Sequence, residues 1–201
     1  HTACAQAEIW RRNGIAIPIS VNISARELTE LDLAERVREE LAYCRLPGRA
    51  LCLEVSEEAV MRDPERARSA LKDVKRLGVS IALDRFGSGE YSLGLPSNLP
   101  LDVLKLDRVL IATFDRDKER RAMFAATIAL AREAGLTAVA VGIETSRQLA
   151  LARELHCSVG QGFLLHGPAA PDRVRFRDPA GTVTSAPWRP LVRLGGNDQY
   201  R

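Results

Sequence analysis

Acidic, amide and basic side chains recur at the ends of short apolar segments that have the composition of β-strands. If these strands are parallel, their carboxyl ends meet at one edge of the sheet, where ligands bind in α/β folds. Carboxylate and amide oxygens are hard donors that suit Mg²⁺, Mn²⁺ or Ca²⁺. The pattern therefore predicts a divalent-metal site at that edge. Its candidate residues are Asn22, Glu54, Glu57, Asp84, Lys105, Asp107, Glu144 and Gln161.

Lys105 lies inside an apolar strand segment, where an unpaired ammonium group is costly. It needs an anionic partner, which is either a carboxylate or a phosphate of a ligand. The segment Gly87-Ser88-Gly89 after Asp84 fits a phosphate-binding loop, although so short a glycine pattern is weak evidence. Alternatively, the Asp84 carboxylate accepts hydrogen bonds from the amides of that turn.

The elements that must position these residues alternate between strand and helix along the chain. Strands are predicted over 17–23, 51–55, 79–83, 103–106, 136–141 and within 159–164. Helices are predicted over 2–13, 29–44, 63–77, 118–134 and 146–155, the second beginning near Thr29 and Asp32 and the third at Asp63-Pro64. This alternation is typical of a parallel sheet with helical crossovers. It fits an open doubly wound sheet or a (β/α) barrel, and a complete barrel would need eight strands where six are predicted.

Composition restricts the class of protein. The chain has 201 residues, of which 46% are hydrophobic and 27% charged, which excludes a disordered, collagen-like or coiled-coil chain. The net charge of +3 is too small to indicate nucleic-acid binding, and no apolar run approaches the length of a membrane span. The four cysteines have no metal-site spacing, so we expect buried, reduced thiols and a cytoplasmic location. We expect one domain over 1–170 and a C-terminal extension over 171–201.

Six motifs in order resemble the EAL domain family. They lie at residues 21–28, 53–57, 81–89, 104–108, 141–145 and 160–163, so the resemblance covers about residues 1–170. It implies a modified (β/α)8 barrel of TIM type that binds cyclic di-GMP. Active members hydrolyse one phosphodiester bond to give linear pGpG, using two Mg²⁺ or Mn²⁺ ions that bind the phosphate and lower the pKa of the attacking water.

The resemblance also implies residue roles. Asn22, Glu54 and Asp84 match ligands of the first metal, and Lys105 matches the lysine that contacts water or phosphate. Glu57 matches a glutamate that braces the loop after Asp84. The supporting and ligand-contacting candidates are Glu144, Gln161, Asp107 and Arg85.

Three departures from the family pattern put hydrolysis in doubt. The Glu-Ala-Leu signature is absent, so we expect a barrel that is incomplete at the N-terminus. Arg85 occupies the position of an aspartate that holds the second metal, a change of two charges. At an effective dielectric constant near 20, a like charge at about 4 Å costs roughly 4 kcal/mol. Val141 occupies the position of a glutamate and neither binds metal nor accepts a proton. At most one metal site is therefore expected.

Two classes of function remain. In the first, the domain is catalytically silent and serves as a scaffold or as a cyclic di-GMP receptor, with the Arg85 guanidinium pairing a phosphate. In the second, it is an active phosphodiesterase that uses either one-metal chemistry or a base supplied by a different residue, for which Glu90 is the candidate. Segment 90–92, Glu-Tyr-Ser, also departs from the family pattern. Helix 118–134 either packs on the barrel or forms a homodimer surface, and an upstream GGDEF or sensory domain is an expected partner.

Overall fold

A computed structural model describes residues 1–87, 98–112, 114, 116–157, 159–174 and 192–193. Two compact units are present, and each has its own core. Unit 1 comprises His1–Ala82, Pro96–Leu101 and Ala170–Pro190. Unit 2 comprises Leu83–Leu95, Asp102–Ala169 and Leu191–Arg201. The expected domain boundary at residue 170 stays a prediction.

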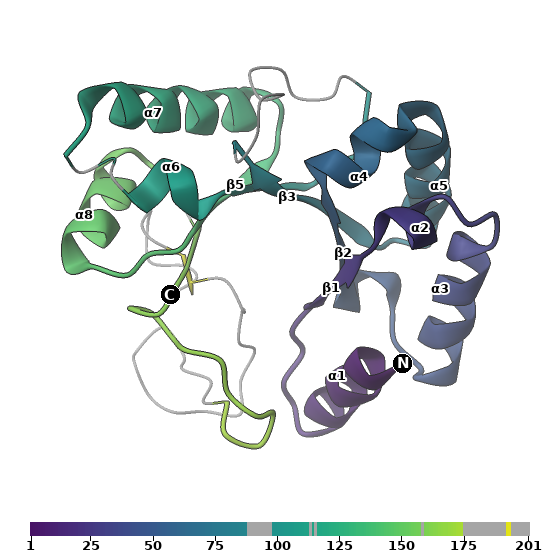
Figure 1. The fold of residues 1–201 in the computed structure, drawn as a ribbon. Helices are drawn as coiled ribbons and strands as arrows, with labels where there is room; N and C mark the ends of the chain where they lie inside the picture. The colour runs from purple at the N-terminus through teal and green to yellow at the C-terminus, as the bar shows by residue number, and fades with distance from the viewer. Residues whose placement is uncertain (88–97, 113, 115, 158, 175–191, 194–201) are drawn as a thin grey trace. The chain divides into compact units, whose positions relative to one another are not determined.

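Unit 1 is built around two parallel strands, β1 (Ile19–Ile23) and β2 (Leu51–Ser56) (Figure 1). Its helices are α1 (Thr2–Arg12), α2 (Ala25–Leu28), α3 (Leu33–Tyr43), the 3-10 turn η1 (Gly48–Ala50), α4 (Glu57–Arg62) and α5 (Pro64–Arg76). α3 packs beside α5, and α2 packs against both α4 and α5. Strand β3 (Ser80–Phe86) begins in unit 1 and continues into unit 2.

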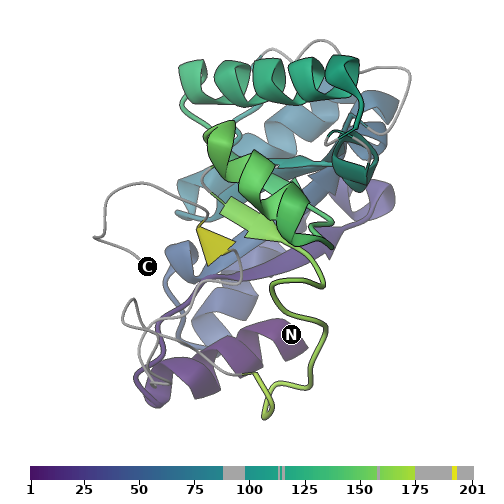
Figure 2. The same cartoon turned by 90° about the vertical axis from the view of Figure 1, so that its left-hand side faces the viewer.

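Unit 2 contains the parallel strands β4 (Val103–Leu106), β5 (Thr137–Val141) and β6 (Val159–Gln161). Its helices are α6 (Arg108–Ala112), α7 (Lys118–Glu133) and α8 (Ser146–Glu154). A last short strand, β7 (Val192–Arg193), pairs antiparallel with β6, and the two are drawn in light green and yellow in Figure 2. Within the sheet, the strands follow chain order from β1 to β7.

The predicted alternation of strands and helices is confirmed, with corrections at the connections. Three short helices, α2, α4 and α6, follow directly on β1, β2 and β4 and were not predicted. Each has six residues or fewer, too short to show helical periodicity in the sequence. The predicted strand beginning at residue 17 starts at Ile19, and β3 extends to Phe86 rather than ending at Leu83.

The helix start predicted near Thr29 was placed too early. Thr29 ends α2 instead, and its hydroxyl donates to the carbonyl oxygens of Ala25 and Arg26, at 3.3 and 3.0 Å. α3 begins four residues later, after Asp32, whose side chain makes no capping bond. The prediction of a start at Asp63-Pro64 is confirmed, because the Asp63 carboxylate accepts from the backbone amide of Arg66 at 3.1 Å.

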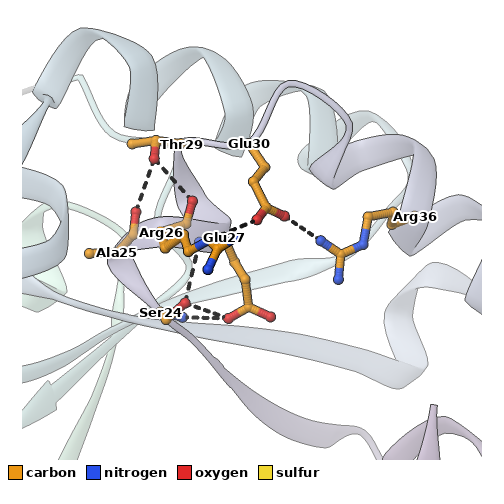
Figure 3. Close-up of polar contacts among 7 residues, drawn as sticks. All are labelled: Ser24, Ala25, Arg26, Glu27, Thr29, Glu30 and Arg36. Carbon is orange, nitrogen blue, oxygen red and sulfur yellow. Dashed lines mark hydrogen bonds and ion pairs between the residues drawn. The ribbon is translucent and has the colours of Figure 1, made fainter.

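A capping box holds the turn that follows β1 (Figure 3). The backbone amide and hydroxyl of Ser24 donate to the Glu27 carboxylate at 3.0 and 2.6 Å, and the Glu27 amide donates back to the Ser24 hydroxyl at 3.3 Å. These bonds satisfy amides that the first turn of a helix leaves unpaired. They also lower the pKa of Glu27. The box thereby fixes the chain two residues after Asn22, a candidate site residue.

Replacing Ser24 by alanine removes the two hydrogen bonds of its hydroxyl, to the Glu27 carboxylate and from the Glu27 amide, and leaves the bond from the backbone amide of residue 24. We expect Ser24→Ala to lower the free energy of unfolding by about 1 kcal/mol. Ser24→Thr keeps the hydroxyl and serves as the matched control. Urea denaturation measures both. Because the lowered pKa of Glu27 stabilises the fold above its ordinary range, the difference between Ser24→Ala and wild type should shrink as pH falls through that lowered pKa. A constant difference down to low pH would contradict this role of Glu27.

Aliphatic and aromatic side chains fill each unit. Unit 1 buries Leu28, Leu53 and Leu71 completely or nearly so. In unit 2 the rings of Phe114 and Phe124 pack edge to face, with centroids 4.8 Å apart. In α7, Phe124, Ile128 and Ala131 are buried, whereas Met123 and Leu130 are more than 40% exposed.

The cysteine prediction is confirmed as far as structure tests it. Cys4, Cys44, Cys52 and Cys157 are all free and buried. Within the described ranges, no helix combines the length and the apolar character that a bilayer crossing requires.

Candidate functional site

In unit 1, two predicted metal ligands lie side by side on neighbouring strands. Asn22 of β1 and Glu54 of β2 are paired Cα partners in the parallel register, about 4.8 Å apart as neighbouring strands are. Paired residues project to the same face of the sheet, so an amide oxygen and a carboxylate are offered together. Asn22 is exposed, whereas Glu54 is 8% exposed. Register alone therefore brings these two side chains together, and their role as metal ligands stays a prediction.

Glu57 begins α4, directly after β2. The preceding Ser56 caps this helix by accepting from the Ala59 amide at 3.1 Å. Glu57 is only 7% exposed, and burial raises the pKa of its carboxyl group. Its predicted role, bracing the loop after Asp84, involves residues 88–97, which lie outside the described residues. The predictions made on Ser88 and Gly89, which follow Gly87, and on Glu90 to Ser92 fall there as well.

Burial of Glu57 has a testable consequence for stability. A carboxyl group whose pKa is raised in the fold costs stability at pH values above that raised pKa, and costs nothing below the unfolded value. We therefore expect Glu57→Gln, which is uncharged at all pH values, to be more stable than wild type at pH 7. The gain should vanish as pH falls into the ordinary range of glutamate. Thermal denaturation across this range measures it, with exposed Glu58→Gln as the control.

In unit 2, Asp84 of β3 and Lys105 of β4 form an ion pair. Lys105 Nζ lies 3.4 Å from Asp84 Oδ1, and the two side chains are 8% and 22% exposed. The prediction that a lysine inside an apolar strand needs an anionic partner is thus confirmed, and a carboxylate supplies it. Asp84 is a candidate metal ligand and Lys105 is a candidate for contacting phosphate. The ion pair therefore links two candidate site residues of opposite charge.

Arg85, next to Asp84, has an unusual backbone conformation. Its φ is +56°, in the left-handed region, and its side chain is exposed. This region costs most L-residues about 1–2 kcal/mol, but Asn and Asp adopt it more readily. The turn continues through Gly87 at φ +88°, where an added Cβ would lie 2.4 Å from the Leu110 side chain. The backbone at residue 85 is therefore better suited to aspartate than to arginine.

Val141 lies at the end of β5, paired with Gln161 of β6. The carbonyl of Gln161 accepts from the amides of Gly142 and Ile143, at 2.8 and 3.0 Å, so the two strand ends are held together. The Gln161 side chain is exposed, and Val141 is half-buried. Residue 141 thus lies beside a predicted ligand-contacting residue but offers no oxygen or nitrogen from its side chain.

Glu144 is exposed after β5, and Gln148 positions its backbone. The Gln148 side-chain oxygen accepts from the amides of Glu144 and Thr145, at 2.9 and 3.0 Å, and its Nε2 donates to the Ile111 carbonyl at 3.3 Å. Gln148 is 6% exposed. Sequence analysis missed this residue. The Thr145-x-x-Gln148 spacing of a capping box was the signal that could have found it.

Asp107 has a local structural contact. Its carboxylate accepts from the Val109 amide at 2.8 Å at the start of α6, and its own amide donates to the Phe86 carbonyl at 2.9 Å. This ties the end of β3 to the end of β4. Contact between Asp107 and a ligand stays a prediction.

The donor chemistry fits one of the two metals that the resemblance implies. Asn22, Glu54 and Asp84 offer oxygen atoms of the kind that Mg²⁺ and Mn²⁺ prefer. The second site does not fit, because Arg85 carries a positive charge and Val141 has no donor atom. The two units are described separately, so the assembly of the three donors into one site is a prediction.

Comparison with known proteins decides the family. The family model described as "EAL domain" matches residues 1–168. The chain belongs to the EAL domain family. Among curated relatives, a cyclic di-GMP phosphodiesterase, NbdA of Pseudomonas aeruginosa, is 38% identical over 75% of this EAL domain chain and 19% of its own length. The bifunctional diguanylate cyclase/cyclic di-GMP phosphodiesterase MucR of the same species is 37% identical over 83% of the chain and 24% of its own length.

Solved EAL structures confirm the fold class. The MucR phosphodiesterase in complex with cyclic di-GMP has a TM-score of 0.80 and 36% identity, over 86% of this chain and 70% of that one. The EAL domain of Mycobacterium smegmatis DcpA has a TM-score of 0.80 and 36% identity, over 85% and 78%. The fold is therefore α/β of the TIM-like barrel type and incomplete. The chain spans less than a quarter of the length of NbdA and about a quarter of MucR.

Proposed function

We propose that this EAL domain acts in cyclic di-GMP signalling without hydrolysing the dinucleotide, as a scaffold or as a receptor. The observation that carries the proposal is the pair Arg85 and Val141 in unit 2. Both occupy positions where the family resemblance implies carboxylates. Neither can bind a cation or accept a proton from water.

A surviving first metal site is part of the proposal. Asn22 and Glu54, paired across β1 and β2, and Asp84 of β3 would hold one Mg²⁺ or Mn²⁺ ion. When bound, such an ion neutralises phosphate charge and lowers the pKa of a bound water. The chain's own residues contribute binding and charge: Lys105, already fixed by Asp84 at 3.4 Å, offers a cation to a phosphate oxygen. Glu57, Glu144, Asp107 and Gln161 are proposed as supporting residues.

Cyclic di-GMP is the proposed ligand because the names of relatives give it as their substrate or bound ligand. MucR was solved in complex with cyclic di-GMP, and NbdA is named as a phosphodiesterase of this dinucleotide. In the receptor version, the exposed Arg85 guanidinium pairs a phosphate that a second metal holds in active enzymes. MucR is named as a bifunctional diguanylate cyclase and cyclic di-GMP phosphodiesterase. We therefore propose a diguanylate cyclase domain as a partner of this chain.

Calorimetric titration of cyclic di-GMP, with Mg²⁺ and then with the ion removed, tests the proposal. Saturable heat without product formation would identify a receptor. Arg85→Ala should then weaken binding by at least about tenfold, with Arg108→Ala, an exposed arginine at the start of α6, as the control. Absence of heat from a folded sample would leave the scaffold version. Formation of pGpG would overturn the proposal that the domain is silent.

A further inference from the structure

Three metal-ligating side chains meet in unit 1, outside the site described above. They are His1 at the start of α1, Glu40 on α3 and Cys44 at the end of α3. One ligand atom from each lies within 4.8 Å of the others, and His1 Nδ1 is 3.1 Å from Glu40 Oε2. Among the described residues, this is the one group of three or more such side chains placed so closely.

The backbone explains why the three side chains converge. Glu40 and Cys44 are four residues apart at the end of α3, so they lie on one face of the helix, one turn from each other. α1 brings His1 to that face, where its ring also lies 5.3 Å from the ring of Tyr43. Two ligands one helical turn apart and a third from another element are a common arrangement in protein metal sites.

We propose that His1, Glu40 and Cys44 bind a zinc ion. Imidazole nitrogen, carboxylate oxygen and thiolate sulfur are the ligand types of zinc, at about 2.0–2.3 Å from the metal. Tetrahedral sites with those bond lengths place ligand atoms roughly 3.3–3.7 Å apart. The His1–Glu40 separation already lies close to this range. The three ligand atoms lie within 4.8 Å of one another, so binding would draw the exposed His1 side chain closer to the sulfur atom.

Cys4 is not among the three side chains that meet in the cluster, and the Cys4→Ser variant below tests whether it supplies a fourth ligand. It lies one helical turn after His1 on α1 and is 5% exposed. Burial, and next the charge of Cys44, raise the pKa of the Cys4 thiol. Burial and then Glu40 raise the pKa of the Cys44 thiol. Zinc would bind the thiolate, and each coordinating thiol would release one proton to solvent.

The ion would join the beginning of α1 to the end of α3, far apart in the chain. His1 and Cys44 are separated by 43 positions, so a metal cross-link here would restrict a long segment of the unfolded chain. The site would therefore stabilise unit 1 and does not depend on the proposed function in cyclic di-GMP signalling.

Cobalt titration of the reduced protein tests the site, because tetrahedral Co²⁺ bound to thiolate has characteristic charge-transfer absorption. One equivalent of Co²⁺ should give this absorption, and Zn²⁺ should displace it. His1→Ala and Glu40→Gln change exposed or half-exposed side chains and should weaken zinc binding by at least about tenfold without unfolding the protein. Glu39→Gln, the exposed neighbour on α3, is the matched control. The protein should carry a residue before His1, so that its α-amine is not a ligand.

The cysteine variants and the effect of zinc on stability decide the proposal. Loss of the sulfur-to-cobalt band in Cys44→Ser, with retention in Cys157→Ser, would support the site, and a weaker band in Cys4→Ser would identify the fourth ligand. Zinc should also raise the melting temperature of wild type but not of Glu40→Gln. A folded protein that shows no thiolate band with Co²⁺, or the same zinc affinity in Glu40→Gln, would leave His1 and Glu40 as a surface ion pair and overturn the proposal.

Discussion

The double variant Arg85→Asp/Val141→Glu is expected to hydrolyse cyclic di-GMP at a rate at least about a hundredfold above that of the parent chain. The two changes restore carboxylates at the two positions of unit 2 that lack metal donors. The backbone at residue 85, with φ at +56°, accepts aspartate more readily than arginine, so the first change should not strain the fold. Both chains should be joined to a Glu-Ala-Leu strand, because the resemblance implies that its glutamate is a metal ligand.

Formation of pGpG, measured by chromatography with Mg²⁺ or Mn²⁺, gives the rate. The single variants are the controls, and each should remain close to the parent because the second metal needs both donors. Arg85→Asn tests the backbone separately. Asparagine adopts the left-handed conformation at residue 85 with less strain than arginine and adds no carboxylate, so this variant should raise the free energy of unfolding but not the activity. A folded double variant that binds the metal yet forms no pGpG would show that other parts of the site have also been lost.

Asp84→Asn is expected to lower the free energy of unfolding by about 3 kcal/mol. The Lys105 side chain is 8% exposed, and its ammonium group lies 3.4 Å from the Asp84 carboxylate. Removing one partner of a largely buried pair destabilises a protein, because the remaining charge keeps its desolvation cost and loses the part of its compensation that the carboxylate supplied. Urea denaturation of the chain without added metal measures this effect.

The double variant Asp84→Asn/Lys105→Met is the decisive comparison for this pair. Removing both charges should recover most of the loss, because methionine fills a similar volume without a buried charge. Asp107→Asn is the matched control: it is also an aspartate at a strand end in unit 2, but its carboxylate accepts from a helix amide, that of Val109. Equal stability of Asp84→Asn and wild type would show that the ion pair contributes nothing to the fold.

Much of the local structure followed from short-range sequence signals. Apolar segments and helix boundaries predicted β4 at its observed bounds and placed the start of α5 at Asp63-Pro64. The motifs predicted the EAL family, which the family model and solved structures confirm. These features were accessible because they depend on residues near one another in the chain or on an ordered series of motifs.

Several features of the candidate site needed the structure. The sequence required an anion near Lys105, but only the pairing of distant segments identified it as Asp84. No sequence pattern indicated the left-handed backbone at Arg85, because φ at a turn depends on the chain on both sides. Gln148 looked like an ordinary helix residue until its side chain was found between Glu144 and the Ile111 carbonyl.

The sequence by itself determined the family, the alternation of strands and helices, and the presence of arginine at position 85 and valine at position 141, where the family resemblance implies carboxylates, because residue identity and local order carry that information. Only the tertiary structure decided which groups become neighbours. The cysteines showed no metal spacing along the chain, yet folding brings Cys44 to His1 and Glu40. Such clusters arise where helices far apart in sequence pack together, and linear spacing does not record that packing.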